Sequence, residues 1–500
     1  MRHSSFTLIA ALLIPTLSVL ADAPVRSLIQ PVWQPSRSPI VSFRILFRAG
    51  AANDPQEKEG VAALTAAMLA KGGSRDRSYE QIVEAMYPMA TSFDWQVDKE
   101  MTVFVGATHV DNLDKYYELI HDMLLNPGFR EDDFARLKSD AINFLKVSLR
   151  DGNDEELGKE ELYNQIYQGH PYGHQNLGRV SSLERLTIDD VRGFYRRHYT
   201  QACLVAGLAG GYPASFPEKM LADFSKLPRG RLSLPRLKRP DGPPGTRIEL
   251  IERETGSTAF SLGFPIQVKR GDPDWAALEL ASSYLGQHRS SNGRLYQRLR
   301  EARGLNYGDY AYIEYFPRGM FQFEPDPNLA RRQQIFQIWI RPVEPKNALF
   351  ALRGALFEFD KLTREGLSEE AFQATRQFLT KNVNILLQTQ DARLGYALDS
   401  RCYGIGDFDA YLAGQLGSLT RESVNETIRR RLKSNSLHIV AVTKNAASLR
   451  DAILQSGPSP ITYNSPKPKE ITDEDKVIEV FPIRVKPDAV RVTPVDQIFQ

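Results

Sequence analysis

Cysteine is nearly absent from this chain of 500 residues, which contains only Cys203 and Cys402. Two cysteines cannot supply the four thiolates of an all-cysteine structural zinc site or the disulfide framework of a small secreted domain. In an exported protein the two could form a disulfide, but because they fall in different halves of the chain, we expect two unpaired, buried thiols. The sequence also lacks a Gly-x-Ser-x-Gly elbow and a P-loop, so it offers no constellation for an autonomous enzyme of those types.

A surplus of charge of one sign is missing as well. The chain has 63 Lys and Arg against 61 Asp and Glu, a formal net charge of +2. This balance does not favour a nucleic-acid partner. With 42% hydrophobic and 25% charged residues, the composition is that of a globular protein that can bury large cores, and the length suggests two to four domains.

Long hydrophobic runs are limited to one, Phe6 to Leu20, near the N-terminus. It follows the basic lead Met1-Arg2-His3 and precedes the small-x-small site Ala21-Asp22-Ala23. The run is too short for a membrane span and is typical of a signal peptide over residues 1–23. We therefore expect an exported, periplasmic protein without a membrane span, whose mature chain starts near Pro24.

Histidines at metal-binding spacing are also scarce. His170 and His174 are the only closely spaced pair, and Pro171 and Gly173 break any helix between them. No carboxylate stands at ligand spacing from them, so we expect a turn with one buried imidazole and no metal.

The two halves of the chain repeat one design. Residues 186–206 read as a helix followed by a strand, and residues 419–441 repeat this order with a constant separation of 233 (419 − 186). Residues 40–45 and 257–262 each read as a strand before a long helix. The repeat predicts two α+β domains in which strands and helical segments mix.

A connector rich in proline, glycine and basic residues separates these halves. We predict an N-terminal domain at 24–227, a linker at 228–247 and a C-terminal domain at 248–465. Residues 466–500 are rich in proline and charge and predict an extended arm, with a short strand at 477–481.

The most informative stretch is Gly60 to Met68, Gly-Val-Ala-Ala-Leu-Thr-Ala-Ala-Met. An alternating, strand-like run and the turn signal Asn53-Asp54-Pro55 precede it, and its apolar residues recur at helical spacing. This strand, turn and helix order resembles the pitrilysin (insulinase) family of zinc peptidases, whose helix carries H-x-x-E-H. The resemblance covers nearly all of the mature chain and implies two homologous α/β domains, each a sheet covered by helices, that form a half-clamshell.

The zinc motif itself is missing. Laid on the family pattern, the two histidine positions fall on Ala63 and Ala67, and the glutamate position falls on Ala66. The family's third ligand, a glutamate, would fall near Asn143 to Ser148, where there is no acid. Alanine can neither bind zinc nor accept a proton from metal-bound water. The resemblance therefore implies this fold without a metal or other cofactor in the chain.

A second family segment is kept. Residues 293–308 closely resemble a helix ending in Leu-Arg-Glu-x-Arg-Gly-Leu-x-Tyr, and the loop at 286–293 resembles a flexible loop near the substrate. The resemblance implies that Arg300 and Tyr307 bind the substrate backbone, since a guanidinium and a phenol can stabilise charge on a carbonyl oxygen. Alternatively, Leu-Arg-Glu is an exposed helix end capped by Gly304, with Tyr307 opening the next strand.

Together these features predict a non-catalytic subunit of a periplasmic peptidase. We expect a heterodimer with a zinc-bearing homologue, in which the zinc belongs to the partner and the substrate is an unfolded peptide. The alternative is a peptide-binding or scaffold protein with no hydrolytic role.

Overall fold

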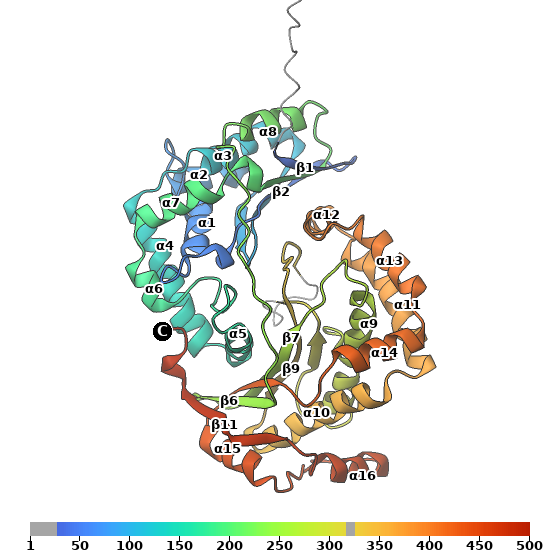
Figure 1. Ribbon diagram of the computed structural model, residues 1–500. Helices are drawn as coiled ribbons and strands as arrows, with labels where there is room; N and C mark the ends of the chain where they lie inside the picture. The colour runs from blue at the N-terminus through green and yellow to red at the C-terminus, as the bar shows by residue number, and fades with distance from the viewer. Residues whose placement is uncertain (1–27, 317–325) are drawn as a thin grey trace, which may run out of the picture.

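Two mixed β-sheets form the framework of the computed structural model, which describes residues 28–316 and 326–500 (Figure 1). The first sheet has the order β1-β5-β2-β4-β3, with β1 Gln30–Pro35, β2 Ile40–Phe47, β3 Phe93–Val97, β4 Thr102–His109 and β5 Leu204–Gly210. The second has the order β11-β6-β10-β7-β9-β8, with β6 Thr246–Glu252, β7 Thr258–Ile266, β8 Asp309–Tyr312, β9 Gln334–Val343, β10 His438–Thr443 and β11 Val485–Pro494. The signal peptide predicted at 1–23 lies outside the described residues.

The strands of the two sheets occupy equivalent places. The order β1-β5-β2-β4-β3 matches β6-β10-β7-β9-β8, and β11 is added beyond β6. Within these matched sets of five strands, the first pair, β1 with β5 and β6 with β10, is parallel and the other pairs are antiparallel, while the added β11 also pairs in parallel with β6. The helices before β5 and β10 begin after capping residues Thr187 and Thr420, whose numbers differ by 233 (420 − 187). The predicted repeat of an α+β unit is confirmed by this order.

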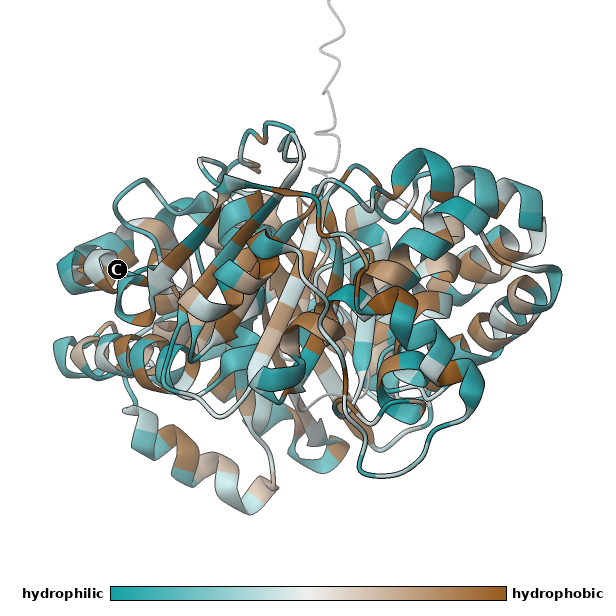
Figure 2. Cartoon of the chain, turned by 90° about the horizontal axis from the view of Figure 1, so that it is seen from below, coloured by the Kyte–Doolittle hydropathy of each residue, from teal (hydrophilic) through white to brown (hydrophobic). Residues whose placement is uncertain are grey.

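Helices cover both sheets, as predicted. The first half contains α1 Val61–Lys71, α2 Tyr79–Met86, α3 Leu113–Leu125, α4 Glu131–Asn143, α5 Asp154–Ile166, α6 Val180–Arg185, α7 Ile188–His198 and α8 Phe216–Phe224. The second half contains α9 Trp275–Gly286, α10 Ala348–Glu365, α11 Glu369–Leu386, α12 Gln390–Tyr403, α13 Phe408–Ser418, α14 Arg421–Arg431, α15 Ala446–Gln455 and α16 Lys469–Ile478. Apolar colour follows the central strands, and polar colour dominates the outer helices (Figure 2), as expected for cores between sheet and helix.

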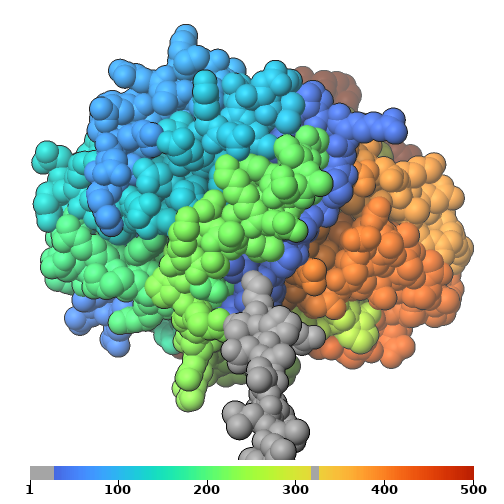
Figure 3. All heavy atoms as spheres, turned by 90° about the horizontal axis from the view of Figure 1, so that it is seen from above, coloured from blue at the N-terminus to red at the C-terminus, as the bar shows by residue number. Residues whose placement is uncertain are grey.

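Two helices are exchanged between the halves. Helix α5 belongs to the first half but packs on β7 and β10 of the second sheet, while α12 of the second half packs on β1, β2 and β5 of the first. Leu394 and Leu398 of α12 share a buried cluster with Val205 and Ala209 of β5. The halves therefore lie against each other over a buried interface, side by side in the view of Figure 3.

The C-terminal segment departs from the prediction. The strand predicted at 477–481 is wrong, because Val477 and Ile478 end helix α16 and Val480 follows it. Val477 and Val480 are exposed whereas Ile478 is buried, so the apolar run does not form one face of a strand. The strand of this segment is β11, which pairs in parallel with β6.

Residues 228–245 form no helix or strand and connect α8 to β6. Cys203 and Cys402 are free thiols, as predicted; Cys203 is buried, whereas Cys402 is partly exposed, which differs from the prediction. Burial raises the pKa of Cys402 to about 12. None of the helices within residues 28–316 and 326–500 has both the length and the apolar content that a membrane span requires.

Candidate functional site

Helix α1 carries the three alanines that replace the zinc motif. Gly60 starts the helix in the left-handed region, with φ of 101°, and the Asp54 carboxylate accepts hydrogen bonds from the Gly60 and Ala62 N–H groups at 2.7 and 2.9 Å. This cap satisfies two of the free N–H groups at the helix start. Ala63, Ala66 and Ala67 are 2%, 0% and 6% exposed, so their methyl groups are core atoms.

The expected third-ligand stretch also lacks metal ligands. Asn143 ends α4, which packs against α1, and residues 144–151 continue it as a π-helical segment. Phe144 and Val147 on this segment are exposed and apolar. Within residues 28–316 and 326–500, no group of three His, Cys, Asp or Glu side chains could hold a metal ion.

The histidine pair forms a turn, as predicted. His174 is the buried imidazole, and its Nε2 lies 3.2 Å from the Asp54 carboxylate that caps α1. His170 is partly exposed, and its Nδ1 accepts a hydrogen bond from the Tyr172 N–H at 3.0 Å.

The structure brings Arg300 and Tyr307 together. Arg300 lies in a π-helical segment, Tyr296–Glu301, and the chain then turns at Gly304, where φ is 71°. Both side chains line an open depression of about 560 Å³ whose other walls are residues 256–257 and 342–344. Tyr307 is 78% exposed. No residue of α1 lines this depression, so within one chain the alanines are not part of the surface that Arg300 and Tyr307 share.

Arg300 differs from the other arginines of the segment formed by residues 293–308. Arg294 holds the buried carboxylate of Glu358 at 2.8 Å. Arg303 holds Asp475 and Glu474 at 2.8 and 2.7 Å, and Arg298 also pairs with Glu474. These contacts attach the segment to α10 and α16.

Arg300 has only local contacts by comparison. Its guanidinium pairs with the neighbouring, exposed Glu301 and lies 5.0 Å from the centre of the Tyr296 ring. An exposed ion pair of this kind is worth about 0–1 kcal/mol, so a ligand can replace it at little cost. Arg300 is therefore the arginine of this segment that is available to a ligand.

The turn that presents Tyr307 is built on a buried acid. The Asn306 side chain donates to Asp309 at 2.7 Å and to the Arg341 carbonyl at 3.1 Å, and its Oδ1 accepts from the Gly308 N–H at 3.1 Å. Asp309 is fully buried, and burial raises the pKa of its carboxyl to about 8. Sequence reasoning missed Asp309, because an acid at a strand start carries no signal of burial.

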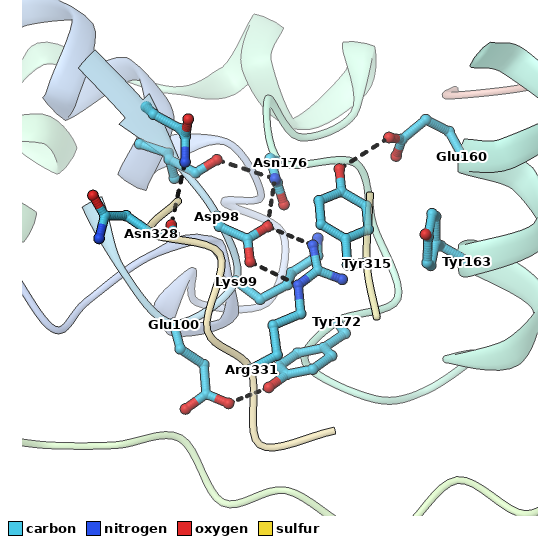
Figure 4. A network of polar contacts seen from close by, with 12 residues as sticks. Asp98, Lys99, Glu100, Glu160, Tyr163, Tyr172, Asn176, Tyr315, Asn328 and Arg331 are labelled. Carbon is cyan, nitrogen blue, oxygen red and sulfur yellow. Dashed lines mark hydrogen bonds and ion pairs between the residues drawn. The ribbon is translucent and has the colours of Figure 1, made fainter. Parts of the chain in front are cut away.

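A second polar cluster joins the two halves (Figure 4). Arg331, before β9, holds Asp98, between β3 and β4, through two hydrogen bonds, one of 2.7 Å. The Tyr315 hydroxyl lies 3.5 Å from Glu160 of α5, and the Arg331 guanidinium lies 3.5 Å from the centre of the Tyr315 ring. Burial raises the pKa of Glu160 to about 7. The ion pair of the cluster, Arg331 with Asp98, therefore connects a residue before β9 of the second sheet to a residue after β3 of the first.

The chain matches two models of one protein family. Residues 33–179 match the family model "Insulinase (Peptidase family M16)", and residues 185–379 match the model "Peptidase M16 inactive domain". An uncharacterized zinc protease of Mycobacterium tuberculosis is 27% identical over 245 residues, which cover 48% of this chain and 54% of the relative. A probable mitochondrial-processing peptidase subunit beta of Arabidopsis thaliana is 22% identical over 248 residues, covering 49% of this chain and 46% of the relative.

The chain spans about half the length of these curated relatives. Among solved structures, a peptidase M16 inactive domain from Pseudomonas fluorescens has a TM-score of 0.69 at 24% identity, covering 83% of this chain and 95% of that one. A protease from Helicobacter pylori also has a TM-score of 0.69, at 14% identity, covering 84% and 98%. At these identities the structures show a shared fold.

Proposed function

Because this chain belongs to the insulinase (M16) family of peptidases, we propose that it is a non-catalytic subunit that pairs with a zinc-bearing homologue. One observation supports the proposal: of the family's two functional segments, the zinc motif is replaced by alanines, whereas the arginine and the tyrosine are present. Ala63, Ala66 and Ala67 place buried methyl groups where metal ligands would stand, whereas Arg300 and Tyr307 share an open depression.

In this proposal the chain contributes binding groups. The partner's zinc supplies the activated water. The Arg300 guanidinium and the Tyr307 phenol donate hydrogen bonds to carbonyl oxygens of an extended peptide and stabilise the charge that develops on the carbonyl under attack. Arg300 exchanges its contact with Glu301 for the peptide, and the Asn306–Asp309 turn keeps Tyr307 projected towards it.

The pairing and the compartment also belong to the proposal. A relative that is named as a subunit supports a role in an assembly. The basic lead, the apolar run and the small-x-small site at 1–23 support export to the periplasm. The expected substrate is an unfolded peptide, since only an extended backbone offers free carbonyl groups along its length.

The decisive experiment is a tagged pull-down of the full chain from the periplasm of its host, followed by reconstitution with the zinc-bearing homologue that co-elutes. In the reconstituted complex, Arg300→Ala should lower kcat/KM for an unfolded peptide by about a hundredfold, the effect of removing one transition-state donor. Tyr307→Phe, which removes one hydroxyl, should lower it about tenfold.

The matched control is Arg364→Ala, which removes an exposed arginine of α10 whose partner is Asp360 one turn away. It should leave kcat/KM unchanged. Purified alone, the chain should carry no stoichiometric zinc and cleave no peptide. A chelator-sensitive activity of the lone chain would overturn the proposal, and recovery of the chain without any homologue would replace it by a peptide-binding protein that does not hydrolyse.

A further inference from the structure

The linker lines a basic groove that has no role in the proposed function. Figure 1 shows the connection from α8 to β6 passing between the two halves. Where residues 236–244 pass the C-terminal end of α5 and the start of β10, they line a groove of about 450 Å³. Residues 165–171 form its wall from the first half, and Arg247 and His438 form its wall from the second. This volume lies within the usual range of small-molecule sites, roughly 300–1,000 Å³.

The charge of the groove is strongly positive. Arg236, Lys238, Arg239 and Arg247 line it, against one acid, Asp241. Over residues 228–247 the chain has six Lys or Arg and one Asp, a balance of +5 (6 − 1), whereas all 500 residues sum to +2. In the described part of the chain, no ion pair or side-chain hydrogen bond engages these four cations. Four unpaired cations around one hollow repel one another, so they favour an anion there.

Two imidazoles complete the groove. His438, the first residue of β10, is 8% exposed, and its Nδ1 has no hydrogen-bond partner among the described residues. The Nε2 of His170 lacks a partner there as well, while its Nδ1 accepts from the Tyr172 N–H. In the neutral ring of His170 the proton is therefore on Nε2, a donor without an acceptor. Unsatisfied buried polar atoms are rare because they cost stability, so two around one hollow need an explanation.

The nearby acids do not cancel this charge. Gln165, which lines the groove, donates to Glu249 of β6. Glu249 is already engaged by Arg491 at 3.1 Å and by the Thr493 hydroxyl. Burial lowers the pKa of both His170 and His438 to about 4. The backbone of Lys238 lies near the His170 ring and opposes this lowering, although Nε2 has no hydrogen bond of acceptable geometry among the described residues. The groove is thus lined by neutral imidazoles beside cations that have no ion-pair partner among the described residues.

We propose that this groove binds a phosphate-class oxyanion, held by the linker cations and by the imidazoles of His170 and His438. Guanidinium groups match the paired oxygens of a phosphoryl group, and charge-assisted hydrogen bonds of this kind are about twice as strong as neutral ones. The groove has room for more than one phosphoryl group, so the ligand class includes inorganic polyphosphates and small phosphate esters. Because residues of both halves and the linker form the site, an occupied groove connects all three. All of the lining residues belong to this one chain, so binding of the anion does not require a second subunit.

The test is calorimetric titration of the full chain with pyrophosphate, with inorganic phosphate and with a hexaglutamate peptide, at constant ionic strength. We expect saturable binding of one pyrophosphate, weaker binding of inorganic phosphate and no binding of the peptide. Lys238→Ala with Arg239→Ala should weaken pyrophosphate binding by about tenfold or more. The matched control is Arg229→Ala with Arg231→Ala, which removes the same charge from exposed linker positions outside the groove and should change affinity less than about twofold.

A second measurement needs no variant. In NMR titrations of the histidine rings, saturating pyrophosphate should raise the pKa of His438 by about one unit or more, since a bound anion favours the protonated ring. Equal loss of affinity in the two double variants would show only a diffuse attraction to the linker and overturn the site. An unshifted His438 would also overturn it, and binding of hexaglutamate in place of pyrophosphate would overturn the ligand class.

Discussion

Asp98 and Arg331 form a two-point ion pair that is buried on both sides and joins the two sheets. Asp98 follows β3 of the first sheet and Arg331 precedes β9 of the second, with the Arg331 Nε 2.7 Å from the Asp98 Oδ2. Asn176 donates to Asp98 at 3.2 Å, and the aromatic ring of Tyr315 covers the guanidinium. The two halves are thus joined by a specific polar contact as well as by the exchanged helices α5 and α12.

This pair predicts a large effect of a single substitution. Arg331→Met should lower the free energy of unfolding by ~3–5 kcal/mol, because it leaves the Asp98 carboxylate buried without its cation. Urea unfolding followed by circular dichroism measures the loss. Asp98→Asn combined with Arg331→Met should cost less than Arg331→Met alone, since no uncompensated charge remains. Arg421→Met, at a partly exposed arginine of α14 that pairs with the adjacent Glu422, is the control and should cost under ~1 kcal/mol. A loss for Arg331→Met as small as the control's would contradict a bridging role.

Asp309 predicts a stability change that depends on pH. Its folded pKa of about 8 lies above its ordinary value of 3.8, so the folded state binds the proton more tightly than the unfolded state. Its contribution to stability is therefore complete below about pH 4 and is lost as the pH rises towards 8. Asp309→Asn should be at least ~1 kcal/mol more stable than the parent at pH 8.5 and should lose most of that advantage at pH 5, where the folded carboxyl is protonated. Urea unfolding at the two pH values tests this.

The control for this measurement is Asp488→Asn, at an exposed position of β11. It should change stability equally at both pH values. If Asp309→Asn were to behave in the same way, the carboxyl of Asp309 would be ionised in the folded protein.

Local patterns allowed much of the fold to be predicted. The Thr187 and Thr420 caps can be recognised from the local sequence. In each, the threonine side chain accepts a hydrogen bond from the backbone N–H three residues later, at the start of the helix. Their shared spacing was enough to show the repeat. The helical spacing of apolar residues from Val61 onward likewise predicted α1, although the helix is buried on all sides from Val61 to Ala70.

Other features could not be predicted because they depend on contacts between distant residues. Nothing local to Asp98 or Arg331 indicates that their loops meet across the two halves. The apolar, β-branched run at 477–481 has the composition of a short strand, but Ile478 is buried by helix packing and the strand forms after Pro482 instead. The different contacts of Arg300 and Arg303 are also invisible in the sequence, because Glu474 and Asp475 lie far along the chain.

The last residues of the chain pack into the first half, so we expect them to contribute to its stability. After β11 the chain crosses to the first half, where Ile498 and Phe499 are buried and the Phe499 carbonyl accepts from the Val180 N–H at 2.9 Å. Phe499→Ala should cost ~2–4 kcal/mol, since it empties a core position. Hydrogen exchange should also speed up in α6, which begins at Val180. Gln497→Ala, at an exposed position, should do neither. Unchanged exchange in α6 with Phe499→Ala would show that the terminus does not support this helix.

The alanines of α1 lead to a prediction about restoring the motif. The triple substitution Ala63→His, Ala66→Glu and Ala67→His recreates two histidines and a glutamate on one helix. The stretch at 143–148 still lacks the acid that would complete the ligand set, and a catalytic zinc site needs three protein ligands. We expect no stoichiometric zinc by elemental analysis of the purified variant.

The same variant should also be less stable than the parent. All three positions are buried, and placing larger polar side chains in a packed core costs ~1–3 kcal/mol each. Ala63→Ser, Ala66→Ser and Ala67→Ser together provide the control, because serine is small and is not expected to bind zinc here. If the histidine variant bound one equivalent of zinc and the serine variant bound none, another side chain near α1 would have to supply the third ligand. The surrounding structure would then still be able to complete a zinc site once the two histidines are present.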